Sequence, residues 1–198
     1  MPRLILGSSS PRRRSLLTIA GFTIAEIVPP NIIEQRAPGE PPKDYVRRLA
    51  KEKAEAVNVE NAWVLAADTI VHRSNQLFEK PSGADDAHRM LRHLSGQWHS
   101  VTSAWEMRWS GPLPCPAASR RVRGSRTSRV KFRNLTDGEI VCYIRTGEGV
   151  DKAGGYAVQG EGAALIERVV GSTTNVVGLP LDSVVPALLK LGIPRSST

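Results

Sequence analysis

The sequence predicts an α/β protein in which strands and helices alternate along one chain. Two neighbouring segments carry most of this prediction. Residues 43–57 place apolar side chains at helical spacing, and residues 62–71 (AWVLAADTIV) form the most apolar run in the chain. That run is short and rich in β-branched residues at its end, which is typical of a central strand buried on both faces. Mixed strands and helices with no internal repeat complete the α/β pattern.

The composition fits one large domain, or two small lobes that share a core, within 198 residues. Apolar residues make up 40% of the chain and aromatic residues only 5%, so we expect an aliphatic core. No stretch approaches the 18 apolar residues of a membrane span, and the N-terminus lacks the apolar region of a secretory signal. Cys115 and Cys142 stand alone, which favours a reducing compartment and argues against structural zinc.

Positive charge is concentrated in one part of the chain. The net charge is +8 and the pI is about 10.0. Basic side chains gather between positions 108 and 133, at Arg108, Arg120, Arg121, Arg123, Arg126, Arg129, Lys131 and Arg133. Such a stretch allows a second hypothesis, a non-enzymatic nucleic-acid-binding protein that uses residues 108–133. Apart from Trp105 and Trp109 at its start, no aromatic residue is interleaved with the arginines at 120–129. The stretch also has no known RNA or DNA motif, so a solvated hairpin is the simpler interpretation.

The first strand and helix are predicted to form an anion site. An apolar run at residues 4–6 leads into Gly7, three serines (Ser8, Ser9 and Ser10), Pro11 and three arginines. Ser10 suits a helix N-cap, Pro11 suits the first helical position, and Gly21 suits the stop. Free backbone N–H groups, hydroxyls and guanidinium groups would then meet at one place, as phosphate binding requires. An ordinary capped surface helix with solvated arginines is the alternative.

The next segments of the chain carry two further charged candidates, Glu34 and Lys53. Residues 22–28 alternate and read as a strand, and residues 31–42, which include Glu34, read as a loop. The helix at 43–57 carries Lys53 on its apolar stripe. On the helix pattern alone we favour a lysine that snorkels to water, with an inward lysine aimed at an anion as the sharper alternative.

Asp68 is the strongest single functional signal in the chain. It lies inside the apolar run at 62–71, and an aspartate is almost never buried unless it is paired, bound to metal or used in chemistry. A structural hydrogen bond to a neighbouring turn is the alternative.

The second half of the chain continues the alternation. We expect capping boxes at Ser82/Asp85 and Thr136/Glu139, each opening a helix, with the second helix burying Ile140, Val141 and Ile144. Further expectations are a hairpin from strands at 101–109 and 120–132 with a proline-rich tip, a glycine-dense loop at 151–162, a strand at 163–170, a polar turn at 171–175, and a last helix at 181–191.

Taken together, the charged positions suit hydrolysis of a phosphoanhydride. Carboxylates (Glu34 and Asp68) can hold a divalent metal or orient water, and cations (Arg12 to Arg14, Lys53 and Lys80) can bind phosphoryl oxygens. The sequence has no G-x-x-x-x-G-K-[ST] and no G-x-G-x-x-G, so it is not a P-loop or Rossmann sequence.

The chain resembles the Maf family of nucleoside triphosphate pyrophosphatases over nearly its whole length, which indicates one Maf-like domain at residues 1–198. The matching motifs are Ser8-Ser9-Ser10-Pro11-Arg12-Arg13, Glu34, Leu49-Ala50 with Lys53-Ala54, Ala66-Ala67-Asp68-Thr69, Lys80-Pro81, Leu94-Ser95-Gly96 with His99, Val101-Thr102, Asp151-Lys152-Ala153-Gly154, Gln159-Gly160 and Asn175-Val176-Val177-Gly178-Leu179-Pro180.

The resemblance implies a cytoplasmic, often dimeric enzyme that uses Mg²⁺ or Mn²⁺ to convert a nucleoside triphosphate into the monophosphate and pyrophosphate. It implies an elongated mixed sheet with flanking helices and two lobes around a deep cleft. By position, Asp68 would be the proton acceptor and would share the metal with Glu34. Substrate choice would fall to Arg12, Thr69 and Gln159, and phosphate binding to Ser8, Arg13, Lys53 and Lys80.

The same motifs resemble the branch of the family that acts on dTTP and UTP, or on modified pyrimidine triphosphates. The 7-methyl-GTP branch, the alternative, differs at the positions of Thr69 and Gln159. Three features depart from the family pattern: Ile33 replaces an acid, Ser103 replaces a glycine, and the Arg/Pro-rich stretch at 108–129 is unusual.

Overall fold

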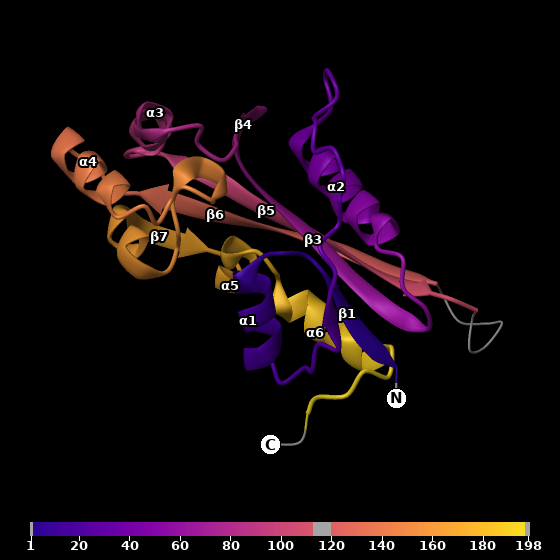
Figure 1. The fold of residues 1–198 in the computed structure, drawn as a ribbon. Helices are drawn as coiled ribbons and strands as arrows, with labels where there is room; N and C mark the ends of the chain where they lie inside the picture. Colours follow the sequence, from indigo (N-terminus) through magenta and orange to yellow (C-terminus); the bar gives the residue numbers. More distant parts are fainter. Residues whose placement is uncertain (1, 113–119, 197–198) are drawn as a thin grey trace.

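A computed structural model describes residues 2–112 and 120–196, and its centre is a seven-stranded mixed sheet (Figure 1). The strands are β1 (Arg3–Gly7), β2 (Glu26–Ile27), β3 (Ala62–Arg73), β4 (Gln76–Phe78), β5 (Trp98–Ser110), β6 (Arg121–Phe132) and β7 (Ile166–Val170). The helices are α1 (Pro11–Ile19), α2 (Pro42–Ala56), α3 (Ala84–Leu94), α4 (Asp137–Arg145), α5 (Thr173–Val177) and α6 (Leu181–Lys190), with short 3₁₀ turns η1 (Ala153–Gly155) and η2 (Gly160–Leu165).

The sheet runs in the order β2-β1-β3-β5-β6-β7, and β4 pairs with the far end of β3. Strand β1 is parallel to both β2 and β3. The pairs β3–β5, β5–β6 and β6–β7 are antiparallel. Strand β3 is therefore central, and nearly all of its side chains are buried. This agrees with the expectation of a strand covered on both faces.

Helices cover both faces of the sheet. On one face, α2 packs Val46, Leu49 and Ala50 against β3 and β5. On the other face, α1 and α6 bury leucine and valine side chains against β3 and β5 in the largest apolar cluster. Because β3 side chains alternate between these two layers, the consecutive polar residues Asp68 and Thr69 point to opposite sides of the strand.

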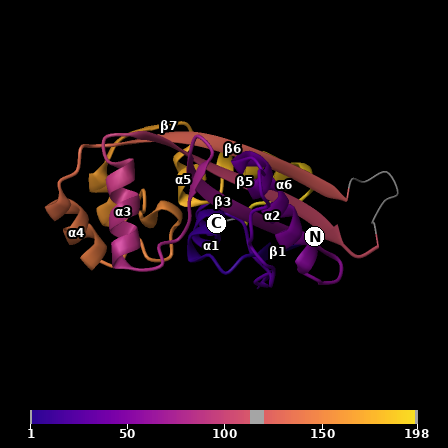
Figure 2. The ribbon, with the colours of Figure 1, turned by 90° about the horizontal axis from the view of Figure 1, so that it is seen from above.

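A second apolar cluster fills the far end of the molecule, where α3 and α4 pack beside the ends of β5 and β6 (Figure 2). Phe132, His99 and Tyr156 meet there edge to face, with ring centroids 4.7–5.4 Å apart. The capping box predicted at Thr136 and Glu139 is present and opens α4. The elongated mixed sheet with flanking helices agrees with the predicted fold class.

The predicted arginine-rich hairpin is present as paired strands on either side of its tip. Strands β5 and β6 pair continuously from Trp98↔Lys131 to Arg108↔Arg121, and the proline-rich tip at 113–119 lies outside the described residues. Its arginines are mostly used within the protein. Arg108 donates to the carbonyls of Ala54 and Val57 at the end of α2, and Arg126 pairs with Asp182.

Five local predictions were wrong. Only two residues of the expected strand at 22–28 form β2, because its beginning is used elsewhere: the Phe22 N–H donates to the Leu17 carbonyl at the end of α1. Asp86, not Asp85, accepts from the backbone and hydroxyl of Ser82. The polar turn at 171–175 becomes helix α5, because Ser172 caps it.

The start of the strand expected at 163–170 belongs to η2, so β7 begins at Ile166. Val141 is exposed, and Tyr143 takes its place in the core. The last helix begins at Leu181, one residue earlier than Pro186 would favour. Among the described residues, no helix combines the length and hydropathy that crossing a bilayer requires.

Acid should weaken the far end of the molecule through His99. Burial lowers the pKa of His99 to about 4, below the value near 6.5 expected in an unfolded chain. The unfolded chain therefore binds more protons between pH 6.5 and pH 4, and stability falls as pH falls through that window. From pH 7 to pH 5 we expect His99 to lower the free energy of unfolding by about 2 kcal/mol.

Urea unfolding at both pH values checks this prediction. The variant His99→Gln should lose that part of the pH dependence, whereas the exposed His93→Gln should keep it. Equal pH dependence in the wild type and both variants would contradict the assignment.

Candidate active site

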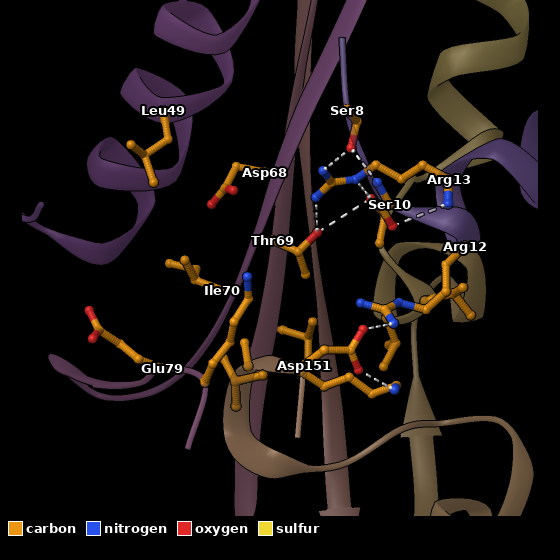
Figure 3. Close-up of a pocket in the computed structure, with 18 of the residues that line it drawn as sticks. Ser8, Ser10, Arg12, Arg13, Leu49, Asp68, Thr69, Ile70, Glu79 and Asp151 are labelled. Carbon is orange, nitrogen blue, oxygen red and sulfur yellow. Dashed lines mark hydrogen bonds and ion pairs between the residues drawn. The ribbon is translucent and has the colours of Figure 1, made fainter. Parts of the chain in front are cut away.

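One cleft of about 750 Å³ opens on the side of the molecule where β1, α1, α2, β3 and the glycine-dense loop converge (Figure 3). Nine of the residues named from the sequence line this cleft: Ser8, Arg12, Arg13, Glu34, Lys53, Asp68, Thr69, Lys80 and Gln159. Arg14, named with Arg12 and Arg13 as a cation, is exposed and does not line it. The nine come from six separate segments of the chain, so the fold brings together positions that are up to 151 residues apart in sequence.

Strand β3 divides the cleft into two sides. Its consecutive residues Asp68 and Thr69 point in opposite directions, Asp68 toward α2 and Thr69 toward the turn before α1 (Figure 3). This follows from the two-residue period of a strand. One side of the cleft is therefore built around a carboxylate, and the other around a hydroxyl.

On the α2 side, a buried ion pair joins two elements. The Lys53 ammonium lies 2.5 Å from Asp68 Oδ1 and 2.9 Å from Glu34 Oε1. Lys53 is only 7% exposed, so the snorkelling interpretation was wrong and the inward lysine is what the structure shows. Lys53 points inward because the apolar face of α2, which carries it, packs on β3. There the Asp68 carboxylate compensates the buried positive charge.

The electrostatic setting of Asp68 is unusual for a carboxylate. Asp68 is also only 7% exposed, and burial raises its pKa above the ordinary value, while the charges of Lys53 and Arg13 act in the opposite direction. The net shift is upward. A cleft carboxylate with a raised pKa is suited to accept a proton during a reaction.

On the α1 side, Arg13 is the central group. Its guanidinium donates to Ser8 Oγ at 3.0 Å, to the Gly178 carbonyl at 3.0 Å and to Thr69 Oγ1 at 3.3 Å. Burial lowers the pKa of Arg13. The predicted N-cap is present, because Ser10 Oγ accepts from the Arg13 backbone and Pro11 opens α1. The strand, turn and helix predicted from residues 4–21 are thus confirmed as structure.

The rim of the cleft carries the other charged positions. Arg12 pairs with Asp151 at 2.9 Å, and Asp151 also contacts the Lys152 ammonium at 2.6 Å. Lys80 and Gln159 line the cleft as exposed side chains. In the glycine-dense loop before Gln159, the chain turns through Gly154 and Gly155, whose φ values of 77° and 70° favour glycine.

Two carboxylates of the cleft, Glu34 and Asp68, are the donors that a hard divalent cation would use. Both contact the Lys53 ammonium, which occupies the point between them. Within residues 2–112 and 120–196, no cluster of three or more His, Cys, Asp or Glu side chains forms a complete metal cage. Mg²⁺ is commonly bound by one or two carboxylates together with water and substrate phosphates, which matches this donor set.

Sequence reasoning missed three features of this region. It did not foresee the Arg12–Asp151 pair, because two exposed charges far apart in sequence carry no local signal. It gave no role to Glu79, which also lines the cleft. It treated Ser103 only as a departure, whereas Ser103 Oγ lies 2.8 Å from Thr69 Oγ1 beneath the cleft.

Comparisons with known proteins give one consistent result. A model of the family described as Maf-like protein matches residues 3–191. A dTTP/UTP pyrophosphatase of Anaeromyxobacter dehalogenans (strain 2CP-1 / ATCC BAA-258) is 47% identical over 98% of this chain and 96% of its own. One from Sphingopyxis alaskensis is 44% identical over 98% and 99%. A solved HAM1 protein from Coxiella burnetii shares the fold, with a TM-score of 0.52 at 12% identity, over 96% of this chain and 100% of its own.

Removing the charge of Lys53 should destabilise the protein. In Lys53→Met the Asp68 carboxylate stays buried without its nearest cation, which should cost about 3 kcal/mol in unfolding free energy near neutral pH. The loss should be larger at pH 8 than at pH 5. The folded pKa of Asp68 lies above its unfolded value, so protonation relieves the buried charge as pH falls.

Urea unfolding of Lys53→Met and of the double variant Lys53→Met/Asp68→Asn measures this coupling. The double variant should recover much of the lost stability. The control Glu34→Gln changes the half-exposed partner and should cost less than about 1 kcal/mol. Purely additive effects in the double variant would contradict a buried pair.

Proposed function

The chain belongs to the Maf-like protein family, and from that premise we propose that it hydrolyses nucleoside triphosphates, preferring dTTP and UTP, to the monophosphate and pyrophosphate. The observation that carries this proposal is the cleft itself. A buried carboxylate with a raised pKa, Asp68, lies there among several cations. Hydrolysis of a phosphoanhydride needs those two kinds of group together.

The phosphates would bind across both sides of β3. Arg13 and Ser8 face the chain from the α1 side, with the N-terminus of a nine-residue helix behind them. Lys53 offers a cation from the α2 side, and Lys80 lies on the rim. Cations on opposite sides suit a polyphosphate longer than one group, because each can neutralise charge on a different phosphoryl group.

Asp68 would accept the proton of the attacking water. The oxygen of that water forms a new bond to phosphorus as the bond between the α- and β-phosphates breaks, and pyrophosphate leaves. A raised pKa keeps Asp68 basic enough to take the proton near neutral pH. Lys53, 2.5 Å away, fixes the orientation of the carboxylate.

A divalent metal such as Mg²⁺ or Mn²⁺ would be held by Glu34 and Asp68, and when bound it would neutralise charge on the phosphate oxygens. Ile33, where the family pattern has an acid, is 84% exposed, so this chain brings one carboxylate from that loop instead of two.

The base would meet Thr69, Gln159 and Arg12. Uracil and thymine present carbonyl acceptors and one N3–H donor, and a glutamine amide supplies both a donor and an acceptor. A site built for these groups rejects a base that leaves them unpaired. We place the reaction in the cytoplasm, in one domain formed by residues 1–198.

Exchange of Asp68 for asparagine should remove most of the turnover. Asp68→Asn keeps the shape of the side chain but cannot accept the proton, so we expect kcat for UTP to fall on the order of 10²-fold or more. The matched control is Asp85→Asn, an exposed carboxylate in the first turn of α3. Near-wild-type turnover by Asp68→Asn in a folded protein would refute the role of Asp68.

Gln159 should affect substrate choice more than rate. The wild type should hydrolyse dTTP and UTP better than dATP, dGTP or 7-methyl-GTP. Gln159→Ala should narrow that gap by about tenfold in kcat/KM, because an unpaired polar group no longer penalises the wrong base. Steady-state kinetics over the nucleotide panel give the answer. Fastest hydrolysis of 7-methyl-GTP by the wild type would assign the chain to the other branch.

A further inference from the structure

A chain of buried hydroxyl groups connects the floor of the cleft to the interior. Thr69 Oγ1 lies 2.8 Å from Ser103 Oγ, and Ser103 Oγ lies 2.9 Å from the Asn175 carbonyl oxygen. Ser103 and Asn175 are fully buried, whereas Thr69 is half-buried and lines the cleft. Thr69, which a nucleotide in the cleft would contact, is thus hydrogen-bonded to the buried residue Ser103 and through it to Asn175.

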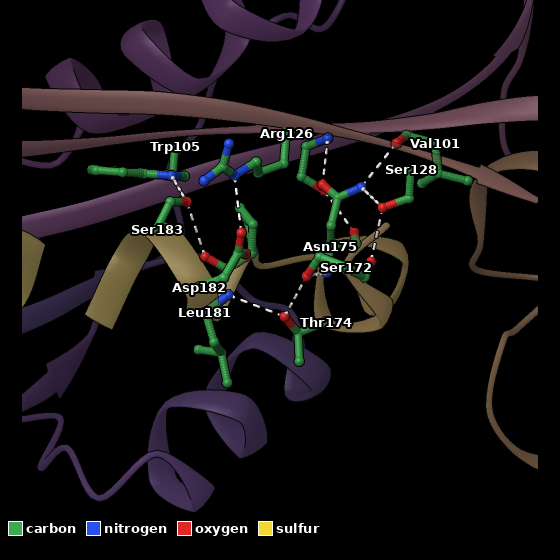
Figure 4. A network of polar contacts seen from close by, with 12 residues as sticks. Val101, Trp105, Arg126, Ser128, Ser172, Thr174, Asn175, Leu181, Asp182 and Ser183 are labelled. Carbon is green, nitrogen blue, oxygen red and sulfur yellow. Dashed lines mark hydrogen bonds and ion pairs between the residues drawn. The ribbon is translucent and has the colours of Figure 1, made fainter. Parts of the chain in front are cut away.

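Hydrogen bonds to three neighbouring residues fix the side chain of Asn175. Its side-chain amide donates to the Val101 carbonyl at 2.9 Å and to Ser128 Oγ at 3.0 Å (Figure 4). Its amide oxygen accepts from the Ser103 backbone N–H at 3.1 Å. The Asn175 carbonyl therefore has a fixed place. Ser103 cannot turn its hydroxyl elsewhere without leaving that carbonyl unpaired in the interior.

These contacts determine where each hydroxyl proton lies. A carbonyl oxygen only accepts, so Ser103 must donate its one proton to Asn175. In the contact between the two hydroxyls, Thr69 is then the donor and Ser103 the acceptor. Arg13 Nη2 also donates to Thr69 Oγ1, at 3.3 Å. Thr69 has thus directed its proton into the protein and received one hydrogen bond, and it retains one lone pair.

We propose that Ser103 is a specificity-determining positioning residue, which makes Thr69 act only as a hydrogen-bond acceptor toward the base. The inference rests on the proposed function, because it assumes that the base meets Thr69. An acceptor there pairs with the N3–H of uracil or thymine. Cytosine carries an acceptor at N3 in a ring of the same size, so two lone pairs would face each other and the base would be rejected.

A residue without a hydroxyl at position 103 would no longer force Thr69 to act only as a hydrogen-bond acceptor. Among the residues that the structure describes, the Thr69 proton would then have only the Gly178 carbonyl as an acceptor, at 3.3 Å, and that oxygen already accepts from Arg13 Nε at 3.0 Å. A longer contact to an occupied acceptor holds a proton less firmly. Thr69 would become free to donate to N3 of cytosine.

The test compares kcat/KM for UTP and CTP. The wild type should prefer UTP, and Ser103→Ala should reduce the UTP-to-CTP ratio about fivefold, mainly by improving CTP, as loss of one directional hydrogen bond predicts. The control is Ser128→Ala. Ser128 is an equally buried hydroxyl on the same Asn175 amide, but it does not contact Thr69, so the melting temperature should fall without a change in the ratio.

A double variant distinguishes an effect of Ser103 that acts through the Thr69 hydroxyl from a general loss of stability. In a Thr69→Val background, Ser103→Ala should have no further effect on the ratio, because no hydroxyl remains to be directed. An unchanged ratio in Ser103→Ala, or an equal change in Ser128→Ala, would overturn the inference while leaving the proposed function intact. Absence of monophosphate and pyrophosphate with every nucleotide in the wild type would instead refute the proposed function.

Discussion

The buried contact between Lys53 and Asp68 is the constraint on which the rest of the cleft depends. An aspartate in the middle of an apolar strand would cost several kcal/mol if it were unpaired, and so would a lysine on the apolar stripe of a helix. At 2.5 Å each compensates the other. The two chain segments can therefore pack as a core while keeping a charged, ordered site at its edge.

The placement of the second half of the site follows from the same strand. Because β3 alternates its side chains, the residue after Asp68 must point to the other layer, where Arg13 meets Thr69. Strand β1 is parallel to β3 and pairs with it, so the turn that follows β1 places Ser8 and Arg13 beside Thr69. A carboxylate side and a cation-hydroxyl side thus arise from two adjacent residues on one strand.

Much of this arrangement could be predicted from local sequence. Ser10, Pro11 and Gly21 define the first helix through capping chemistry, and the apolar run around Asp68 marks a buried strand that must compensate a charge. The identity of the partner could not be read locally. Lys53 was assigned to water because a helix pattern does not reveal what lies opposite, and only the packing of α2 on β3 supplies Asp68. Likewise, the Arg12–Asp151 pair and the Ser103–Asn175 contact join segments that are far apart in the chain.

Under the proposed function, this cleft directs cleavage to the bond between the α- and β-phosphates. Phosphorus NMR of the products that the wild type forms from UTP with Mg²⁺ identifies the bond that breaks. We expect UMP and pyrophosphate in equal amounts, with no orthophosphate in early time points. Release of orthophosphate and UDP would contradict it.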